Sequence, residues 1–125
     1  MGSPVVHFEI NSEHPERSRE FYAKLFDWAI RDASDAAYGL VNTGADDGIN
    51  GGIAQARALA GVEPDAKAPA PSVTFYVRVD DLQKYLDRAV ELGGRALVPP
   101  THLMKGVTLA MFADPDGHVV GLVKG

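Results

Sequence analysis

The chain has 125 residues, of which 46% are hydrophobic and 23% charged, and its 12 basic and 17 acidic residues give a net charge of -5. This is enough chain for one domain around one hydrophobic core, without a cluster of Lys and Arg on which nucleic acid could dock, and no apolar run approaches the roughly 20 residues of a membrane helix. The absence of cysteine excludes disulfides, thiolate nucleophiles and cysteine metal sites, and favours a cytoplasmic location.

The chain begins with a pattern that predicts a strand followed by a helix. Apolar and polar residues alternate over residues 4–12, which places Phe8 and Ile10 on one face of a strand. The polar residues of the opposite face are His7, Glu9 and Asn11. Pro15 then suits the first turn of a helix. The apolar spacing of this helix predicts an inward stripe, made of Ser18, Phe21, Tyr22, Leu25 and Trp28.

Short strands and a linker are predicted to follow the first helix. The strand candidates are residues 29–33, 38–43 and 49–56. Gly51 and Gly52 loosen the last of them and indicate a bend or bulge. Residues 57–71 mix Ala, Pro, Gly and charge without periodicity, so we interpret them as a linker.

After the linker the same pattern begins again. Residues 73–78 superpose on residues 6–11, with Phe75 and Val77 in the apolar places. The next helix has an apolar stripe with the spacing of the first, made of Leu82, Tyr85, Leu86, Ala89 and Leu92. Strand candidates follow at residues 95–98, 107–113 and 118–123. The simplest account is an internal repeat, with a first module at residues 4–56 and a second at residues 72–125 within one structural domain.

The last two strands are separated by Asp114-Pro115-Asp116-Gly117. Pro115 presets its own φ, the Asp side chains can accept hydrogen bonds from nearby backbone amides, and Gly117 accepts a positive φ. The sequence therefore predicts a tight hairpin at the end of the chain, with His118 in a turn role.

This repeat, together with the Asp-Pro-Asp-Gly turn, resembles the vicinal oxygen chelate superfamily, the group of glyoxalase, bleomycin-resistance and extradiol dioxygenase proteins. The resemblance extends from Val5 to Val123. Its most specific parts are residues 6–10, 17–28, 79–82 and 112–117. It implies an α+β fold in which two tandem βαβββ modules form an open, cup-shaped mixed sheet with the helices outside.

The resemblance also implies where a metal would bind. Metal-dependent members hold a divalent ion with His or Glu from the first and fourth strands of each module. His7 matches the first such position, whereas Thr74 and Gly121 stand where ligands are lost. The remaining position falls within residues 51–55, in a register that the sequence leaves open. Because a divalent ion requires three or more well-placed ligands, we expect no metal and no other cofactor.

His7 and Glu9 are the candidate catalytic residues. Side chains at i and i+2 of a strand point the same way and lie about 7 Å apart, so both can enter one cavity. A desolvated Glu9 would have a raised pKa and could act as a base, with His7 as proton donor or substrate clamp. The alternative is that both merely satisfy neighbouring polar groups on the sheet.

Five further residues are candidates for substrate binding: Asn11, Thr74, Tyr76, Arg78 and Met111. Arg78 could hold an anionic substrate group or pair with Glu9, and we favour the internal pair because an unpaired carboxylate in a cup is costly. Met111 could form an adaptable apolar wall or belong to the core.

The sequence is therefore interpreted as a glyoxalase-like protein that binds a small metabolite or performs simple proton-transfer chemistry on it, and whether it is an enzyme, such as a lyase or isomerase, is left open. One alternative is a bleomycin-resistance-like protein that sequesters an antibiotic. Another is a metal-dependent lyase or dioxygenase with a non-standard ligand set. A small-molecule ligand and a second copy of the chain, in a homodimer, are the expected partners.

Overall fold

The computed structural model describes residues 2–33, 38–55, 72–104 and 106–125, so the predicted linker at residues 57–71 lies outside the described residues. Ten elements follow one another: β1 (Val5–Ser12), α1 (Pro15–Phe26), β2 (Ala29–Asp32), β3 (Tyr38–Asn42), β4 (Asn50–Gln55), β5 (Ser72–Val79), α2 (Leu82–Glu91), β6 (Arg95–Met104), β7 (Val107–Ala113) and β8 (Val119–Lys124). This order is strand, helix and three strands, twice over, which confirms the predicted α+β class. No helix in the described ranges is long and apolar enough to cross a lipid bilayer.

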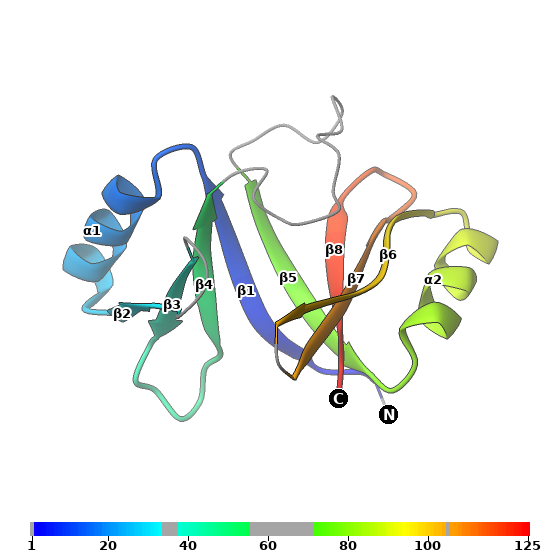
Figure 1. Cartoon of the computed structure of the whole chain (residues 1–125), viewed down its shortest axis with the longest axis horizontal. Helices are drawn as coiled ribbons and strands as arrows, with labels where there is room; N and C mark the ends of the chain where they lie inside the picture. The colour runs from blue at the N-terminus through cyan, green and yellow to red at the C-terminus, as the bar shows by residue number, and fades with distance from the viewer. Residues whose placement is uncertain (1, 34–37, 56–71, 105) are drawn as a thin grey trace.

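The strands form one mixed sheet in the order β2-β3-β4-β1-β5-β8-β7-β6. The sheet stays open, and α1 and α2 lie at its two ends (Figure 1). Antiparallel β1 and β5 join the two halves in the middle, while β4 and β8 run parallel to them on either side. A single chain therefore builds the whole cup.

The pairing register repeats from one half of the sheet to the other. Across the centre, Glu9 pairs with Thr74. Within the halves, Glu9 pairs with Gly52 on β4, and Tyr76 pairs with Gly121 on β8. Because Tyr76 occupies in the second half the place of Glu9 in the first, Gly52 is the counterpart of Gly121.

The two faces of the sheet have different cores. On the outer face, Leu82 and Leu86 of α2 pack against Val79, Ala110 and Leu122 of the sheet. On the opposite face, which we call the inner face, the second half carries an apolar cluster formed by Tyr76, Val98, Leu109 and Met111. The inner face of the first half carries the polar side chains of β1.

The first helix packs differently from the predicted stripe. No residue of α1 is fully buried, and Phe21 and Leu25 are each 58% exposed. The rings of Tyr22 and Phe26 instead surround Trp28, which follows the helix, with centroid distances of 5.5 and 5.1 Å. The contact surface is this aromatic cluster, so the predicted stripe was wrong at Phe21 and Leu25.

The edge strand β6 is longer than its prediction, which ended at residue 98 before two prolines. The strand continues to Met104, with register shifts between Val98 and Thr101 around those prolines. Proline lacks the N–H that an interior strand needs, but an edge strand with irregular pairing accommodates it.

The predicted hairpin joins β7 and β8. The backbone N–H of Gly117 donates to the carbonyl of Asp114 over 2.9 Å, and Gly117 has a φ of 94°. The carboxylate of Asp114 accepts from the backbone N–H of His118 over 2.8 Å and also contacts the ring of His118. His118 thus has the turn role that the sequence indicated.

Shortening a leucine of the second helix region to alanine should destabilise the protein at a buried position and not at an exposed one. Leu86 is 2% exposed, whereas Leu92, the C-cap residue, is 63% exposed, so the predicted stripe was wrong at Leu92. We expect Leu86→Ala to lower the free energy of unfolding by about 2–5 kcal/mol because it leaves a cavity. The matched variant Leu92→Ala should change it by less than about 0.5 kcal/mol. Urea denaturation measures both, and equal losses would contradict this packing of α2.

Candidate functional site

Polar side chains of β1 and β5 meet at the centre of the inner face. Glu9 is 2% exposed, and Thr74 beside it is 4% exposed. His7 is half-buried and pairs in register with Tyr76, whose ring lies edge-on to the imidazole at 5.7 Å. Strand alternation and the antiparallel register therefore bring together four of the predicted site residues.

A chain of hydrogen bonds connects His7 to Glu9 through Tyr38 of β3. Nε2 of His7 lies 2.8 Å from the hydroxyl oxygen of Tyr38. The Tyr38 side chain is also hydrogen-bonded to Glu9. The hydroxyl of Tyr76 donates to Oε2 of Glu9 over 3.2 Å, and the side chain of Asn11 is a further partner of this carboxyl group. Tyr38 was not among the predicted site residues.

Each tyrosine occupies space that a glycine leaves open. A Cβ atom on Gly52 would lie 1.9 Å from the hydroxyl oxygen of Tyr38, and one on Gly121 would lie 2.3 Å from the ring of Tyr76. Both contacts are far shorter than any real Cβ contact. The two equivalent glycines therefore admit the two phenols that reach Glu9.

Burial is the main cause of the pKa shifts of Glu9, His7 and the two tyrosines. Desolvation raises the pKa of Glu9, although hydrogen bonds from Tyr38, Tyr76 and Asn11 act in the opposite direction. Desolvation lowers the pKa of His7, so the ring is neutral at pH 7. Burial and the nearby charge of Glu9 raise the pKa of both phenols, which therefore keep their protons.

Arg78 does not pair with Glu9, so the favoured ion pair was wrong. Arg78 is exposed, and within the described part of the chain no carboxylate contacts it. The antiparallel register explains this, because it places Thr74 opposite Glu9 and Arg78 four residues farther along β5. The hydroxyls of Tyr38 and Tyr76 satisfy Glu9 instead.

The remaining predicted residues lie on either side of this centre. Asn11 donates to the side-chain oxygen of Ser72 over 3.4 Å, at one end of the β1–β5 pair. Met111 is 3% exposed and packs with Tyr76 in the inner apolar cluster. Its surroundings are those of a core residue, which is one of the two roles that the sequence left open.

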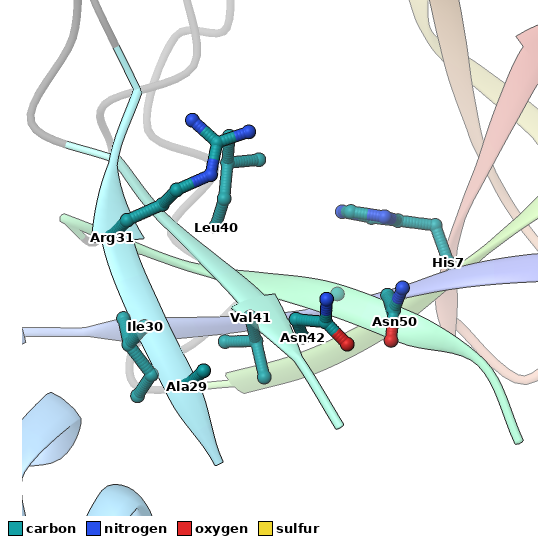
Figure 2. A pocket seen from close by; sticks show the side chains of 9 residues that line it. His7, Ala29, Ile30, Arg31, Leu40, Val41, Asn42 and Asn50 are labelled. Carbon is teal, nitrogen blue, oxygen red and sulfur yellow. The ribbon is translucent and has the colours of Figure 1, made fainter. Parts of the chain in front are cut away.

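A cavity of about 400 Å³ lies beside His7, in the first half of the cup. It is lined by His7 with residues of β2, β3 and β4, among them Arg31, Leu40, Asn42 and Asn50 (Figure 2). Of the predicted site residues, His7 alone is among the described residues that line it. The sequences of β2 and β3 contain no motif from which the other lining residues could have been predicted as site residues.

The donor set at the family's metal positions does not fit a divalent ion. The resemblance implies ligand positions at His7, Thr74 and Gly121, and the register makes Gly52 the counterpart of Gly121, so two of these four residues have no side chain. Across the described ranges, no three residues among His, Cys, Asp and Glu are grouped so as to hold a metal. Divalent ions in proteins take three or more N, O or S ligands, so one imidazole and one hydroxyl are insufficient.

Comparison with known families agrees with this architecture. The family model described as Glyoxalase/Bleomycin resistance protein/Dioxygenase superfamily matches residues 5–122. The chain belongs to this superfamily. Similar curated proteins are those named "Putative glyoxylase CFP32" from Mycobacterium bovis and Mycobacterium tuberculosis, each 27% identical over 115 residues. The match covers 91% of this chain and 42% of the relative, so the chain spans less than half the length of these relatives.

Two solved structures share the fold of this chain at low sequence identity. The hypothetical protein BH1468 from Bacillus halodurans is 12% identical, with a TM-score of 0.68 over 100% of this chain and 96% of that one. A methylmalonyl-CoA epimerase in complex with methylmalonyl-CoA and NH4+ is 13% identical, with a TM-score of 0.62 over 98% of this chain and 94% of that one. At these identities the likeness shows the fold alone.

Adding a methyl group at Gly52 should disrupt the site. Because a Cβ there would collide with the Tyr38 hydroxyl at 1.9 Å, Gly52→Ala must displace this tyrosine. We expect a loss of about 1–3 kcal/mol in the free energy of unfolding from overpacking. Gly48→Ala is the control, since nothing lies within 4 Å of a Cβ there. Urea denaturation measures both variants, and equal stability would exclude the proposed contact.

The buried carboxyl group should give stability a specific pH dependence. Unfolded Glu9 loses its proton near its ordinary pKa of 4.5, whereas the folded protein holds that proton to higher pH. Between these two pKa values the folded state binds more protons, so the contribution of Glu9 to the free energy of unfolding falls as pH rises and then levels off. Glu9→Gln removes this contribution, so the variant should gain stability relative to the wild type as pH rises above 4.5.

Urea denaturation of both proteins from below pH 4.5 to neutral pH measures this difference. A difference in stability that stays constant across the whole interval would show that burial does not perturb Glu9.

Proposed function

We propose that this glyoxalase-superfamily chain binds a small molecule in its cup and transfers a proton to or from that molecule without a metal ion. The observation that carries the proposal is the chain of contacts from His7 through Tyr38 to Glu9. His7, at one end of this chain of contacts, lines the cavity, and Glu9, at the other end, is excluded from solvent.

The proton path follows from the donors and acceptors in this chain. Neutral His7 can take a proton from the ligand at Nδ1 while its Nε2–H donates to the hydroxyl oxygen of Tyr38. The Nε2 proton then passes to Tyr38 as the hydroxyl proton of Tyr38 passes to the carboxylate of Glu9. The result is a neutral imidazole, an intact phenol, a protonated Glu9 and a deprotonated ligand, and reversal of these steps returns the proton.

The perturbed pKa values support this direction of transfer. Desolvation raises the pKa of Glu9 and lowers that of His7, so the proton is held more favourably on the carboxyl group than it would be in water. A base of this kind suits removal of a proton from carbon next to a carbonyl group. Tyr38 is the positioning residue, because it connects a buried acid to the ring that faces the cavity.

Two features support metal independence. Gly52 and Gly121 provide no ligand, and Tyr38 and Tyr76 occupy the space into which a larger side chain at these positions would extend. A metal-dependent lyase or dioxygenase would therefore need a ligand set different from that of the family. Of the four positions at which the resemblance implies a metal ligand, His7 alone carries a side chain of the type that the family uses.

Sequestration without turnover is the alternative, and the deep burial of Glu9 favours it. With 2% exposure, Glu9 cannot touch a ligand in the cavity directly. If Tyr38 and Glu9 serve only to fix the orientation of His7, the cup binds its ligand and releases it unchanged. Exchange of hydrogen on the ligand distinguishes the two functions.

Hydrogen exchange in heavy water should therefore test the proposal. A ligand found by thermal stabilisation would be incubated with the protein in D₂O, and its deuterium content measured by mass spectrometry. We expect deuterium at an acidic carbon position, and a rate lowered by about a hundredfold or more in Tyr38→Phe, since general acid–base groups contribute about 10²–10⁴. Tyr76→Phe removes a hydroxyl that contacts Glu9 but not His7, and should have a smaller effect.

Recovery of the ligand without deuterium would favour sequestration. Elemental analysis of protein purified without chelator tests separately whether the protein holds a metal ion. Stoichiometric Ni, Zn, Fe or Mn that is lost in His7→Ala would overturn metal independence.

We further propose a cytoplasmic homodimer. Val73 and Phe75 on the outer face of β5 are 71% and 44% exposed, and an apolar strand surface of this kind is suited to contact with another chain. Both properties stay predictions from the sequence.

A further inference from the structure

Arg31 contributes a positive charge to the cavity beside His7. It lies on β2 and pairs in register with Leu40, which places its side chain on the same face of the sheet as Leu40. Within the described part of the chain, no hydrogen bond or ion pair engages its guanidinium group, while its neighbour Asp32 is paired with Arg19. In Figure 2, Arg31 and His7 lie on opposite sides of the cavity.

Two asparagines, on strands β3 and β4, present hydrogen-bond donors on the His7 side of the cavity. Oδ1 of Asn50 accepts from the backbone N–H of Thr43 over 3.0 Å, and Oδ1 of Asn42 accepts from the backbone N–H of Gly44 over 2.8 Å. Because a backbone N–H can only donate, these contacts fix which atom of each amide is the oxygen. The NH₂ groups of Asn42 and Asn50 are left to donate elsewhere.

The polar lining thus has one chemical character. Its described side chains are a guanidinium group, two amides with occupied oxygens and the imidazole of His7, and none is acidic. The chain as a whole carries a net charge of -5, so a cavity with a cation and no carboxylate differs from the average surface. Apart from the imidazole of His7, these side chains present donors and no free acceptor, and such a set matches an oxyanion, which only accepts hydrogen bonds.

We infer that this cavity is a subsite for an oxyanion of the ligand, a carboxylate or a phosphate, held by Arg31, with the amide groups of Asn42 and Asn50 as further donors nearer to His7. The inference rests on the proposed function, in that the cup binds a small molecule. It names the substrate class as small organic anions whose reactive carbon lies on the His7 side of the anionic group. Leu40 provides an apolar contact for the remainder of such a ligand.

Binding of three simple probes tests this subsite. Phenylacetate, phenyl phosphate and the neutral phenylacetamide would be titrated into isotope-labelled protein, with NMR signals of the Asn42 and Asn50 side-chain amides and the Arg31 Nε–H as readouts. We expect these signals to shift with the anions and not with the amide. Arg31→Ala should weaken anion binding by about tenfold or more, the size of a lost hydrogen bond to a charged group. Comparison of the two anions distinguishes a carboxylate from a phosphate subsite.

Arg17→Ala is the matched control, because it removes the same charge from an exposed position on α1 outside the cavity. Equal binding by Arg31→Ala and wild type, equal binding of amide and acid, or no anion binding at millimolar concentration would each overturn the subsite. Tyr38→Phe separates this result from the proposed chemistry. It should bind the anions normally while it loses deuterium exchange, so failure of the proton path would leave the subsite standing.

Discussion

The antiparallel pairing of β1 with β5 is the constraint on which the rest of the molecule depends. It turns two small sheets into one, so that neither module presents its first strand as an open edge. It also fixes which side chains face the cup together, because a slip of β1 by one residue would move Glu9 to the outer face, away from Thr74. The position of the site is thus a consequence of backbone register.

A buried carboxyl group is costly, and the inner face is organised to reduce that cost. Glu9 lies beneath two phenols and beside Thr74, and each phenol fits because the strand next to it carries a glycine. Hydrogen bonds from these hydroxyls stabilise the ionised form, and exclusion of water stabilises the protonated form. Burial is the larger of the two effects, so the pKa of Glu9 lies above its ordinary value.

The sequence was sufficient for the fold and for part of the site. Alternation along β1 and its repetition in β5 place His7 and Glu9 on the same face without any three-dimensional information. Tyr38 could not be found in this way, since its contact with Glu9 depends on the register of β3 against β4 and of β4 against β1. The arrangement of Arg78 depends similarly on a register between strands far apart in the sequence.

The packing of α1 and the donors of the cavity also differ from what the sequence predicted, for local reasons that the spacing of apolar residues does not reveal. The predicted stripe of α1 followed from the spacing of apolar residues alone, whereas the contacts of Tyr22 and Phe26 are with an aromatic cluster around Trp28. The cavity donors belong to short strands, and their significance comes from which amide atoms are already bonded. These hydrogen bonds depend on the conformation of the turn between β3 and β4, which the sequence pattern does not specify.

The fit of each tyrosine against its glycine also restricts how this site can change. A carboxylate side chain at position 52 and a tyrosine at position 38 compete for the same volume, so a larger residue at position 52 requires a change at position 38. Conversion to a metal centre of the family type would require Gly52 and Tyr38 to change together, and Gly121 and Tyr76 likewise. Enlarging the glycine first gives an overpacked intermediate, at a cost of about 1–3 kcal/mol, whereas reducing the tyrosine first leaves a cavity. Substitutions within each glycine–tyrosine pair should therefore be non-additive, which constrains any redesign of the cup.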